Sequence, residues 1–292
     1  MATITSEGWH TTGDGVKLFT KSWKPTNPAS ASVVFLHGFS DHCTRFTDLF
    51  QNLVGHGIEV HAFDQRGWGH SVTRKSERGR TGPTSQVLSD ITGYLNTLLP
   101  SSIPLFLMGH SMGGQEVLTY ATQGPERISH QLRGFLAEAP HIRLHALGEP
   151  SWFIVLAGRF ASKLFPYWQF VSRLDPKYMC RDETTRSLWP TDDLCHDTGT
   201  LEGIVGMLDR AKELQSGRPE VRDWDGLSVA LFHGTGDMCC DCEATKTYYE
   251  KLPVKDKKLF VYEGVYHCIH LEPEEDKKGF IKDVADWILD RI

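Results

Sequence analysis

The sequence contains no apolar run long enough to cross a bilayer. The segment WFIVLAG at 152–158 is far shorter than the ~18 apolar residues that a spanning helix needs. The first ten residues, MATITSEGWH, lack the basic stretch and the apolar core of a secretory signal. These absences predict a cytoplasmic protein without a membrane-spanning segment.

Basic residues are fewer than acidic residues in this sequence. The 31 Lys and Arg residues are outnumbered by 37 Asp and Glu residues, the formal net charge is -6, and the basic run that stands out is the short RKSERGR at 74–80. Proteins that bind nucleic acid rely on clustered Lys and Arg, so we expect no nucleic-acid partner. The chain has 292 residues, 40% of them hydrophobic and 23% charged, which suits a globular protein with one large core.

The sequence also gives little indication of disulfide bonds, metal sites or cofactor sites. Seven cysteines cannot all pair, which favours reduced intracellular thiols over a secreted disulfide framework. Cys239 and Cys242 have the spacing of zinc ligands, but no second such pair follows, and HCIH at 267–270 does not supply one. Cys240 and Cys242 are either reactive thiols or, more commonly, buried structural ones. The loop GWG at 67–69 has neither the dinucleotide nor the Walker pattern, so we expect no metal and no organic cofactor.

Short apolar runs alternate along the chain with segments of helical spacing. The expected strands are residues 16–23, 32–38, 58–64, 103–109, 132–140, 227–234 and 257–264. The expected helices are residues 43–55, 84–99, 111–124 and 275–290. This alternation predicts an α/β fold with a mainly parallel, doubly wound sheet, formed by residues 1–140 and 223–292.

The alternation fails between residues 141 and 222. This insertion carries the apolar-rich segment SWFIVLAGRFASKLFPYWQFV at 151–171 and has no linker composition, so we expect a helical lid over the core. Six of its apolar residues either line a tunnel for an acyl chain or pack on the core as an ordinary helix face. They are Trp152, Phe153, Leu156, Phe160, Leu164 and Phe165.

A Gly-x-Ser-x-Gly pattern lies between an expected strand and an expected helix, in LFLMGHSMGG at 105–114. In that position the two glycines give the backbone room for a sharp turn that holds Ser111 out of the sheet as a nucleophile. The N–H of Met112 can then face the oxyanion that forms during acyl transfer. The alternative is a glycine-rich turn with an ordinary serine, and the strand–turn–helix context argues against it.

A nucleophilic serine needs a histidine base and an acid that orients the histidine. On a sheet of this kind the chain order is serine, acid, histidine, each after a later strand. LFHGTGD ends an expected strand at Asp237, and LFVYEGVYH ends the next one at His267. Asp241 and His270 are the rival positions, but each lies further from its strand end.

A second oxyanion donor normally comes from the loop after an early strand. VVFLHGFSDH at 33–42 supplies such a loop, in which the N–H of Phe39 is the natural candidate. The alternative is that HGF only closes a strand. We expect the amides of Phe39 and Met112 together to form the oxyanion hole.

These motifs together resemble those of the monoacylglycerol lipase group of α/β-hydrolases, particularly its fungal members. The matching segments are VVFLHGFSDHCTRF, FDQRGWGHS, LFLMGHSMGG, LAEAP, LFHGTGD and YEGVYH. The resemblance implies an α/β-hydrolase fold, no cofactor, and a lid that forms an apolar tunnel and can rest on a membrane or lipid-droplet surface. It implies the triad Ser111, Asp237 and His267, with the amides of Phe39 and Met112 as oxyanion donors.

The predicted reaction is hydrolysis of a monoacylglycerol to a fatty acid and glycerol through an acyl-serine. A lysophospholipase or a general carboxylesterase with the same triad is the alternative among enzymes, and a charged headgroup would need clustered Arg or Lys at the tunnel mouth. A ligand-binding receptor with little turnover is the alternative outside the enzymes, on fold analogy alone. Epoxide hydrolases share HGF but carry Asp in place of Ser111, which sets that class aside.

Overall fold

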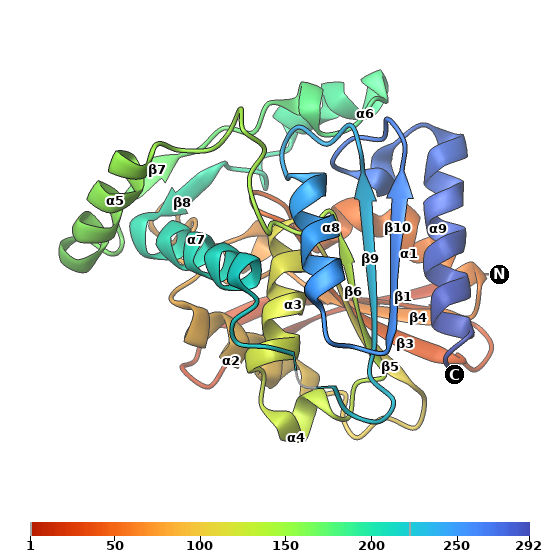
Figure 1. Cartoon of the computed structure of the whole chain (residues 1–292). Helices are drawn as coiled ribbons and strands as arrows, with labels where there is room; N and C mark the ends of the chain where they lie inside the picture. The colour runs from red at the N-terminus through yellow and green to blue at the C-terminus, as the bar shows by residue number, and fades with distance from the viewer. Residues whose placement is uncertain (1, 222) are drawn as a thin grey trace.

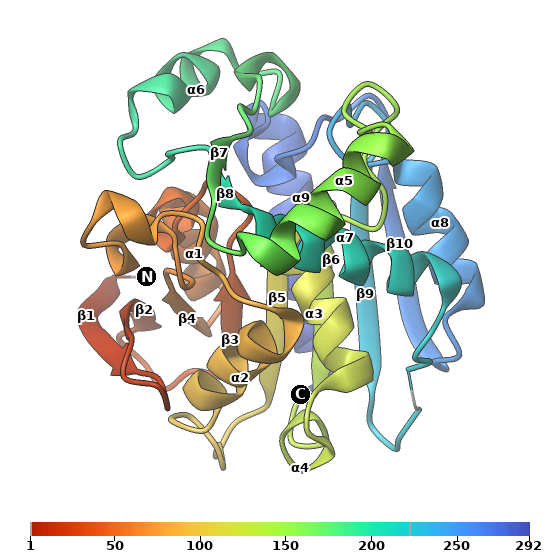
Figure 2. The ribbon, with the colours of Figure 1, turned by 90° about the vertical axis from the view of Figure 1, so that its left-hand side faces the viewer.

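The computed structural model describes residues 2–221 and 223–292, and their strands form one large and one small sheet. The large sheet has eight strands within this part of the chain, in the order β1-β2-β4-β3-β5-β6-β9-β10 (Figure 1, Figure 2). The strands from β4 to β10 in this order run parallel. Their bounds are β3 Ala31–Leu36, β4 Ile58–Phe63, β5 Leu105–His110, β6 Gly134–Glu138, β9 Ser228–Gly234 and β10 Asp256–Tyr262.

Apolar side chains place four of these strands in the middle of the sheet. Every residue of β3, β5, β6 and β9 is buried. Burial on both faces is typical of parallel strands that are covered by helices from both sides. The prediction of a mainly parallel, doubly wound sheet is therefore confirmed.

Helices cover both faces of the sheet. α1 (Thr47–Gly55) and α9 (Glu274–Leu289) pack together on one face, and α2 (Thr84–Leu95), α3 (Met112–Gln123) and α8 (Cys242–Lys251) lie on the other (Figure 1). Each face has its own apolar core. Side chains of α1 and α9 belong to one cluster of buried residues, and those of α2, α3 and α8 belong to the other.

Shorter elements connect these helices and strands. They are α4 Glu126–Ser129 and the 3-10 turns Cys43–Phe46, Gly69–Ser71, Lys75–Glu77, Pro176–Tyr178, Trp189–Thr191 and Ile269–Leu271. The helix expected at 43–55 is thus a 3-10 turn followed by α1, and the helix expected at 84–99 already ends at Leu95.

Two longer elements of the core, β1 and α8, have no counterpart among the expected strands and helices. β1 (Thr3–Thr11) pairs antiparallel with β2 (Lys17–Pro25) at the edge of the sheet. The residues of β1 are half-buried or exposed, so this strand lacks the apolar run that marks a buried one. The helix α8 has a largely polar sequence, in which the buried positions are Cys242, Ala244, Thr245 and Tyr248. Both elements depend on pairing or packing rather than on a strong local pattern.

The insertion between β6 and β9 contains three helices and a two-stranded sheet in its described part. Their bounds are α5 Trp152–Leu164, β7 Gln169–Val171, α6 Glu183–Leu188, β8 Thr198–Thr200 and α7 Leu201–Ser216. α7 contacts α3 of the core, whereas α5 packs on α7 and has no buried residue (Figure 2). Among the helices described, none is both long and apolar enough to traverse a bilayer.

Gly113 lies where α3 passes close to β3. A Cβ at this position would lie 2.2 Å from the carbonyl oxygen of Leu36, which is closer than the atoms can approach without a backbone shift. Gly113→Ala should therefore lower the free energy of unfolding, measured by urea titration, by about 1–3 kcal/mol, the usual cost of overpacking.

Gly279→Ala is the matched control for this substitution. Gly279 lies in α9, and nothing lies within 4 Å of its Cβ position. The substitution should raise the free energy of unfolding by about 0.5–1 kcal/mol, because alanine has the higher helix propensity. Equal effects of the two substitutions would contradict the close approach at Gly113.

Candidate active site

The carboxyl ends of three parallel strands carry the predicted nucleophile, acid and base. Ser111 follows β5 directly, Asp237 follows β9, and His267 follows β10. Parallel strands end at the same edge of a sheet, where the ligands of such folds bind. The three side chains meet at this edge.

Ser111 occupies a strained turn between β5 and α3. Its backbone has φ 55° and ψ -114°, and a positive φ is rare for a residue other than glycine. The N–H of Ser111 donates a 2.9 Å hydrogen bond to the carbonyl oxygen of Glu138 at the end of β6. The N–H of His141 donates a 3.0 Å hydrogen bond to the carbonyl oxygen of Ser111. These contacts hold the strained turn at the predicted nucleophile.

His267 links Ser111 to Asp237 through its two ring nitrogens. Nε2 lies 2.9 Å from Ser111 Oγ, and Nδ1 lies 2.7 Å from Asp237 Oδ2. The other carboxylate oxygen, Oδ1, accepts hydrogen bonds from the backbone N–H groups of Cys239 at 2.7 Å and Cys240 at 2.9 Å. An ionised Asp237 keeps the proton of neutral His267 on Nδ1, which leaves Nε2 able to accept the proton of Ser111.

Burial and charge set the protonation states in this hydrogen-bond chain. Burial alone would raise the pKa of Asp237, but the charge of His267 and the hydrogen bonds from His233 and His267 outweigh it and hold this pKa far below its ordinary value. Burial would lower the pKa of His267, yet the charge of Asp237 and its hydrogen bond raise that pKa above 6.5. His267 is therefore a stronger base than a free histidine, next to an acid that stays ionised.

The rival acid and base have other partners. Asp241 accepts a 2.9 Å hydrogen bond from Nε of Arg143. Nδ1 of His270 lies 2.8 Å from Oε1 of Glu138, a fully buried carboxylate. The acid and base that the sequence analysis preferred are the two in the hydrogen-bond chain from Ser111.

Two backbone donors lie beside the nucleophile. The N–H groups of Phe39 and Met112 have no hydrogen-bond partner among the described residues. Met112 is the first residue of α3, and a helix N-terminus carries a partial positive charge. Both residues line the same cavity as Ser111. Free donors at this place are what the predicted oxyanion hole requires.

The cavity at Ser111 has a volume of about 350 Å³ and mostly apolar walls. Pockets that bind small molecules generally have this size and character. Many of its larger apolar side chains come from the insertion, residues 141–222. They include Leu144, Leu147, Tyr178, Trp189, Ile204 and Met207.

The six residues predicted to line an acyl tunnel lie elsewhere. Trp152, Phe153, Leu156, Phe160, Leu164 and Phe165 are 44–75% exposed, and none of these six lines the cavity. The prediction that these six residues line an acyl tunnel is therefore wrong. The alternative, that their helix packs on the core, is also wrong, because α5 has no buried residue. The cause is that α5 packs on α7, which is the helix that contacts the core.

The sequence analysis missed the contribution of α7 to the cavity. Ile204 and Met207 lie one turn apart on this helix and both line the cavity. An apolar pair at a spacing of three residues is a helical signal that could have been found. The segments that precede it, RDETTRS at 181–187 and TDDLCHDTGT at 191–200, are polar, so the apolar helical pattern begins only at residue 201.

The thiols near Asp237 are buried rather than reactive. Cys240 and Cys242 are both buried, and burial raises the pKa of Cys240 well above its ordinary value and that of Cys242 to about 11. A buried, protonated thiol is a poor nucleophile, which favours the structural alternative. All seven cysteines are free, and in the described part of the chain no group of three candidate metal ligands includes Cys239 or Cys242.

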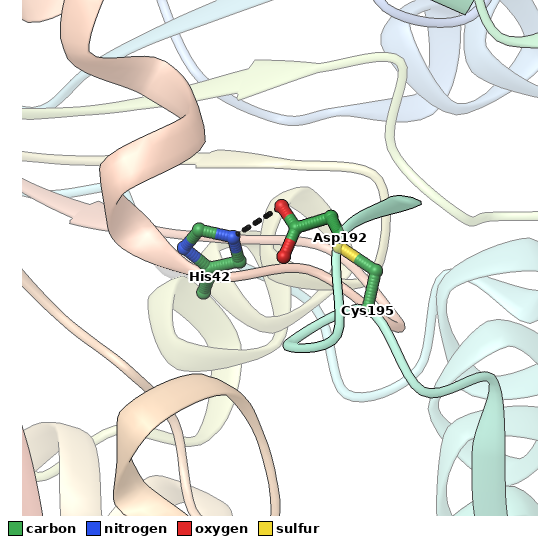
Figure 3. Close-up of side chains that lie close together, drawn as sticks. All are labelled: His42, Asp192 and Cys195. Carbon is green, nitrogen blue, oxygen red and sulfur yellow. Dashed lines mark hydrogen bonds and ion pairs between the residues drawn. The ribbon is translucent and has the colours of Figure 1, made fainter. Parts of the chain in front are cut away.

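A cluster of candidate metal ligands joins the loop after β3 to the insertion. His42, Asp192 and Cys195 bring a ring nitrogen, a carboxylate oxygen and a sulfur within 4.8 Å of one another (Figure 3). Nη1 of Arg45 lies 3.7 Å from both Asp192 Oδ2 and Cys195 Sγ. Because this guanidinium already supplies a positive charge, the cluster does not fit a cation.

Comparison with known proteins identifies the family. The family model described as serine aminopeptidase, S33, matches residues 27–274. The chain belongs to this hydrolase family. It is 34% identical over 275 residues to a Schizosaccharomyces pombe protein named as a candidate monoglyceride lipase, covering 93% of this chain and 71% of that protein. It is 28% identical over 285 residues to the monoglyceride lipase of Rattus norvegicus, covering 96% and 89% of the two chains.

Two solved structures have the same fold as this chain. A soluble variant of the Saccharomyces cerevisiae monoglyceride lipase, in complex with a substrate analog, has a TM-score of 0.89 at 24% identity, covering 100% of this chain and 96% of that one. The monoacylglycerol lipase of Paleococcus ferrophilus has a TM-score of 0.79 at 25% identity, covering 100% of both chains. The α/β-hydrolase fold and the resemblance to monoacylglycerol lipases are thus confirmed.

Proton transfer to His267 predicts how activity depends on pH. The reaction needs neutral His267, and its pKa is raised above 6.5, so kcat/KM should fall as the pH decreases through a value above 6.5. Asp237→Asn removes the charge that raises this pKa, so the acid limb of the pH–rate profile should move to lower pH, while kcat falls by about 10⁴-fold.

The measurement is a pH–rate profile for a soluble ester. Asp241→Asn is the matched control, since it removes a nearby carboxylate that pairs with Arg143 instead, and its acid limb should coincide with that of the unaltered protein. An unshifted limb in Asp237→Asn would show that Asp237 does not set the pKa of His267.

Proposed function

We propose that the chain is a monoacylglycerol lipase that releases a fatty acid and glycerol through an acyl-serine. The observation that carries this proposal is the hydrogen-bond chain from Asp237 through His267 to Ser111 beside a mostly apolar cavity. The names of the relatives in Schizosaccharomyces pombe and Rattus norvegicus support the same substrate class.

In the proposed mechanism, Ser111 Oγ attacks the ester carbonyl while His267 Nε2 takes its proton. The oxyanion accepts hydrogen bonds from the amides of Phe39 and Met112, and such donors are worth about 10²–10³ in turnover each. His267 then gives the proton to the glycerol oxygen as the C–O bond breaks, and Asp237 stabilises the imidazolium. Water attacks the acyl-enzyme with loss of its proton to His267, and that proton returns to Ser111 as the fatty acid leaves.

The charges around the cavity favour an uncharged alcohol. Arg173 lines the cavity together with the acidic residues Asp41 and Asp175. Asp41 is paired with Arg45 at 3.1 Å and Asp175 with Lys177 at 2.7 Å, so neither carboxylate is an uncompensated charge. Arg173 by itself does not form the cluster of Arg and Lys that a phosphate headgroup would need, which favours an uncharged alcohol such as glycerol.

The substrate class is tested by release of glycerol and fatty acid from 1-monooleoylglycerol, with lysophosphatidylcholine in parallel. We expect faster hydrolysis of the monoacylglycerol. Ser111→Ala should lower its turnover by about 10⁶-fold, because the nucleophile is removed. Ser187→Ala, which alters an exposed serine of α6, should retain full activity.

Release from neither lipid by the folded protein would refute the lipid-ester proposal. Labelling with a fluorophosphonate probe then separates the remaining possibilities. A labelled Ser111 would point to an esterase for other substrates, and an unlabelled one to a binding protein with little turnover.

We further propose that residues 141–222, of which residue 222 lies outside the described part, form a lid whose helix α5 rests on a lipid surface. Exposed apolar patches of large extent mark interaction sites. Lys163 on the same helix can attract anionic headgroups, whereas Arg159 is paired with Asp209 of α7. The patch consists of Trp152, Phe153, Ile154, Leu156, Phe160, Leu164, Phe165, Tyr167 and Trp168.

Co-sedimentation with phospholipid vesicles tests this surface. Phe153 and Phe160 lie two turns apart on α5 and are 65% and 64% exposed. The double substitution Phe153→Ser/Phe160→Ser should weaken vesicle binding by about tenfold or more, since each phenylalanine can contribute up to about 1.5–3 kcal/mol on burial. Hydrolysis of a soluble ester should not change.

Leu188→Ser is the control for this experiment, because it removes an apolar side chain of similar exposure, 62%, from α6. It should leave vesicle binding unaltered. Equal loss of binding in the control and in the double variant would refute a specific role of α5.

A further inference from the structure

One continuous segment of the insertion lies against the loop that carries the Phe39 amide. We call residues 38–42 the oxyanion loop and residues 192–197 the clasp segment. Three contacts connect the two: hydrogen bonds reach Ser40 and His42 directly, and a ring contact reaches Phe39 through Trp68. This connection crosses about 150 residues of sequence.

The first contact is a charged hydrogen bond at the end of the oxyanion loop. Nε2 of His42 lies 2.9 Å from Oδ2 of Asp192, as the dashed line in Figure 3 marks. Nδ1 of His42 lies 2.7 Å from Oγ1 of Thr44, so both ring nitrogens have partners. Burial would raise the pKa of Asp192, but the contact with His42 and the charge of Arg45 lower it, so the carboxylate is ionised. The ring of His42 is thus held from both sides.

The second contact joins two strained residues. The N–H of Asp197 donates a 2.7 Å hydrogen bond to Oγ of Ser40. Ser40 has φ 53° and Asp197 has φ 51°, and they are two of the four non-glycine residues with positive φ in the described chain. Each such conformation costs about 1–3 kcal/mol and persists only where the surroundings hold it. Ser40 directly follows the residue whose amide is the proposed donor.

The third contact reaches Phe39 through aromatic rings. The ring of His196 stacks on Trp68 with centroids 4.9 Å apart and an interplanar angle of 10°. Trp68 in turn meets the ring of Phe39 edge to face at 4.8 Å. Burial lowers the pKa of His196 to about 4, so its ring is neutral and donates a 3.0 Å hydrogen bond from Nε2 to the carbonyl oxygen of Gly67. The hydrogen bond to Gly67 therefore holds the His196 end of the stack in place.

We propose that Asp192, His196 and Asp197 are positioning residues for the oxyanion hole: the clasp segment holds the strained oxyanion loop so that the Phe39 N–H meets the developing oxyanion. This inference rests on the proposed function. The oxyanion hole is then a joint product of the core and the insertion. Because the Phe39 amide acts on the oxyanion and not on the ground-state ester, loss of the clasp lowers kcat rather than raising KM.

The first test compares two neighbouring acids. Asp192→Ala removes the partner of His42, and Asp193→Ala removes the adjacent, exposed carboxylate. Both variants are assayed on p-nitrophenyl butyrate and on 1-monooleoylglycerol, with rates expressed per active site titrated by a fluorophosphonate. Asp192→Ala should lower kcat by about tenfold or more, part of the 10²–10³ that one donor supplies, with KM close to that of the unaltered protein. Asp193→Ala should match the unaltered protein.

A second pair of variants separates strain from contact. Ser40→Ala and Ser40→Gly both remove the hydroxyl that accepts from Asp197, but glycine adopts φ 53° without strain. Ser40→Ala should therefore lose more kcat than Ser40→Gly. Equal loss in the two would show that the strained backbone does not matter for the donor.

The affinity for a compound that forms a stable oxyanion at Ser111 is a measurement that a change in packing alone would not alter. Addition of Ser111 Oγ to a trifluoromethyl ketone, with the proton passing to His267, creates a stable oxyanion. The affinity for this ketone should fall in Asp192→Ala by the same factor as kcat. A lowered melting temperature with unaltered kcat per active site and unaltered ketone affinity would show a packing role only and overturn the inference.

The proposed substrate class and the proposed positioning role of the clasp segment can be refuted independently of each other. If the unaltered protein cleaves p-nitrophenyl butyrate but not 1-monooleoylglycerol, the substrate proposal is wrong and the positioning role is decided on the soluble ester. If it cleaves neither, both proposals are overturned.

Discussion

The turn at Ser111 is the constraint on which the rest of the site depends. A serine with positive φ can connect β5 to α3 because Gly109 and Gly113 allow a very close approach: a Cβ on Gly109 would lie 2.4 Å from the carbonyl oxygen of Gly113. The same turn starts α3 at Met112, so the hydroxyl and the N-terminus of a helix come together in one step. Every other group of the site is placed relative to this turn.

The buried charge of Asp237 is the second requirement of the site. It needs hydrogen-bond donors around it, and these come from β9 and from the loops that follow β9 and β10. Its two oxygens contact Nε2 of His233 at 3.1 Å, Nδ1 of His267 at 2.7 Å and the N–H groups of Cys239 and Cys240. A buried carboxylate without such partners would be costly. With them it stays ionised and orients the base. The loop that follows β9 therefore acts as the support of the acid.

The insertion has one part that contacts the core and another part that is largely exposed to solvent. α7 and residues 192–197 contact the core through apolar, aromatic and charged side chains, whereas α5 contacts α7 and leaves its large apolar side chains exposed. Residues of the first part line the cavity and contact the oxyanion loop. In our proposals the first part positions the Phe39 amide and the second part contacts a lipid surface. One segment of the chain would then serve both the hydrolysis of the ester and the approach of its substrate.

The sequence by itself determined the features that have a local or periodic signal. Buried parallel strands appear as short apolar runs, the turn at Ser111 needs its glycines, and the order of serine, acid and histidine follows the strand order. Tertiary structure decided the rest. β1 is a strand because β2 pairs with it, and the exposed face of α5 depends on where α7 lies. The contacts of Asp192 and Asp197 with the oxyanion loop join residues about 150 positions apart, and no local pattern carries such a contact because its partners meet only after the chain has folded.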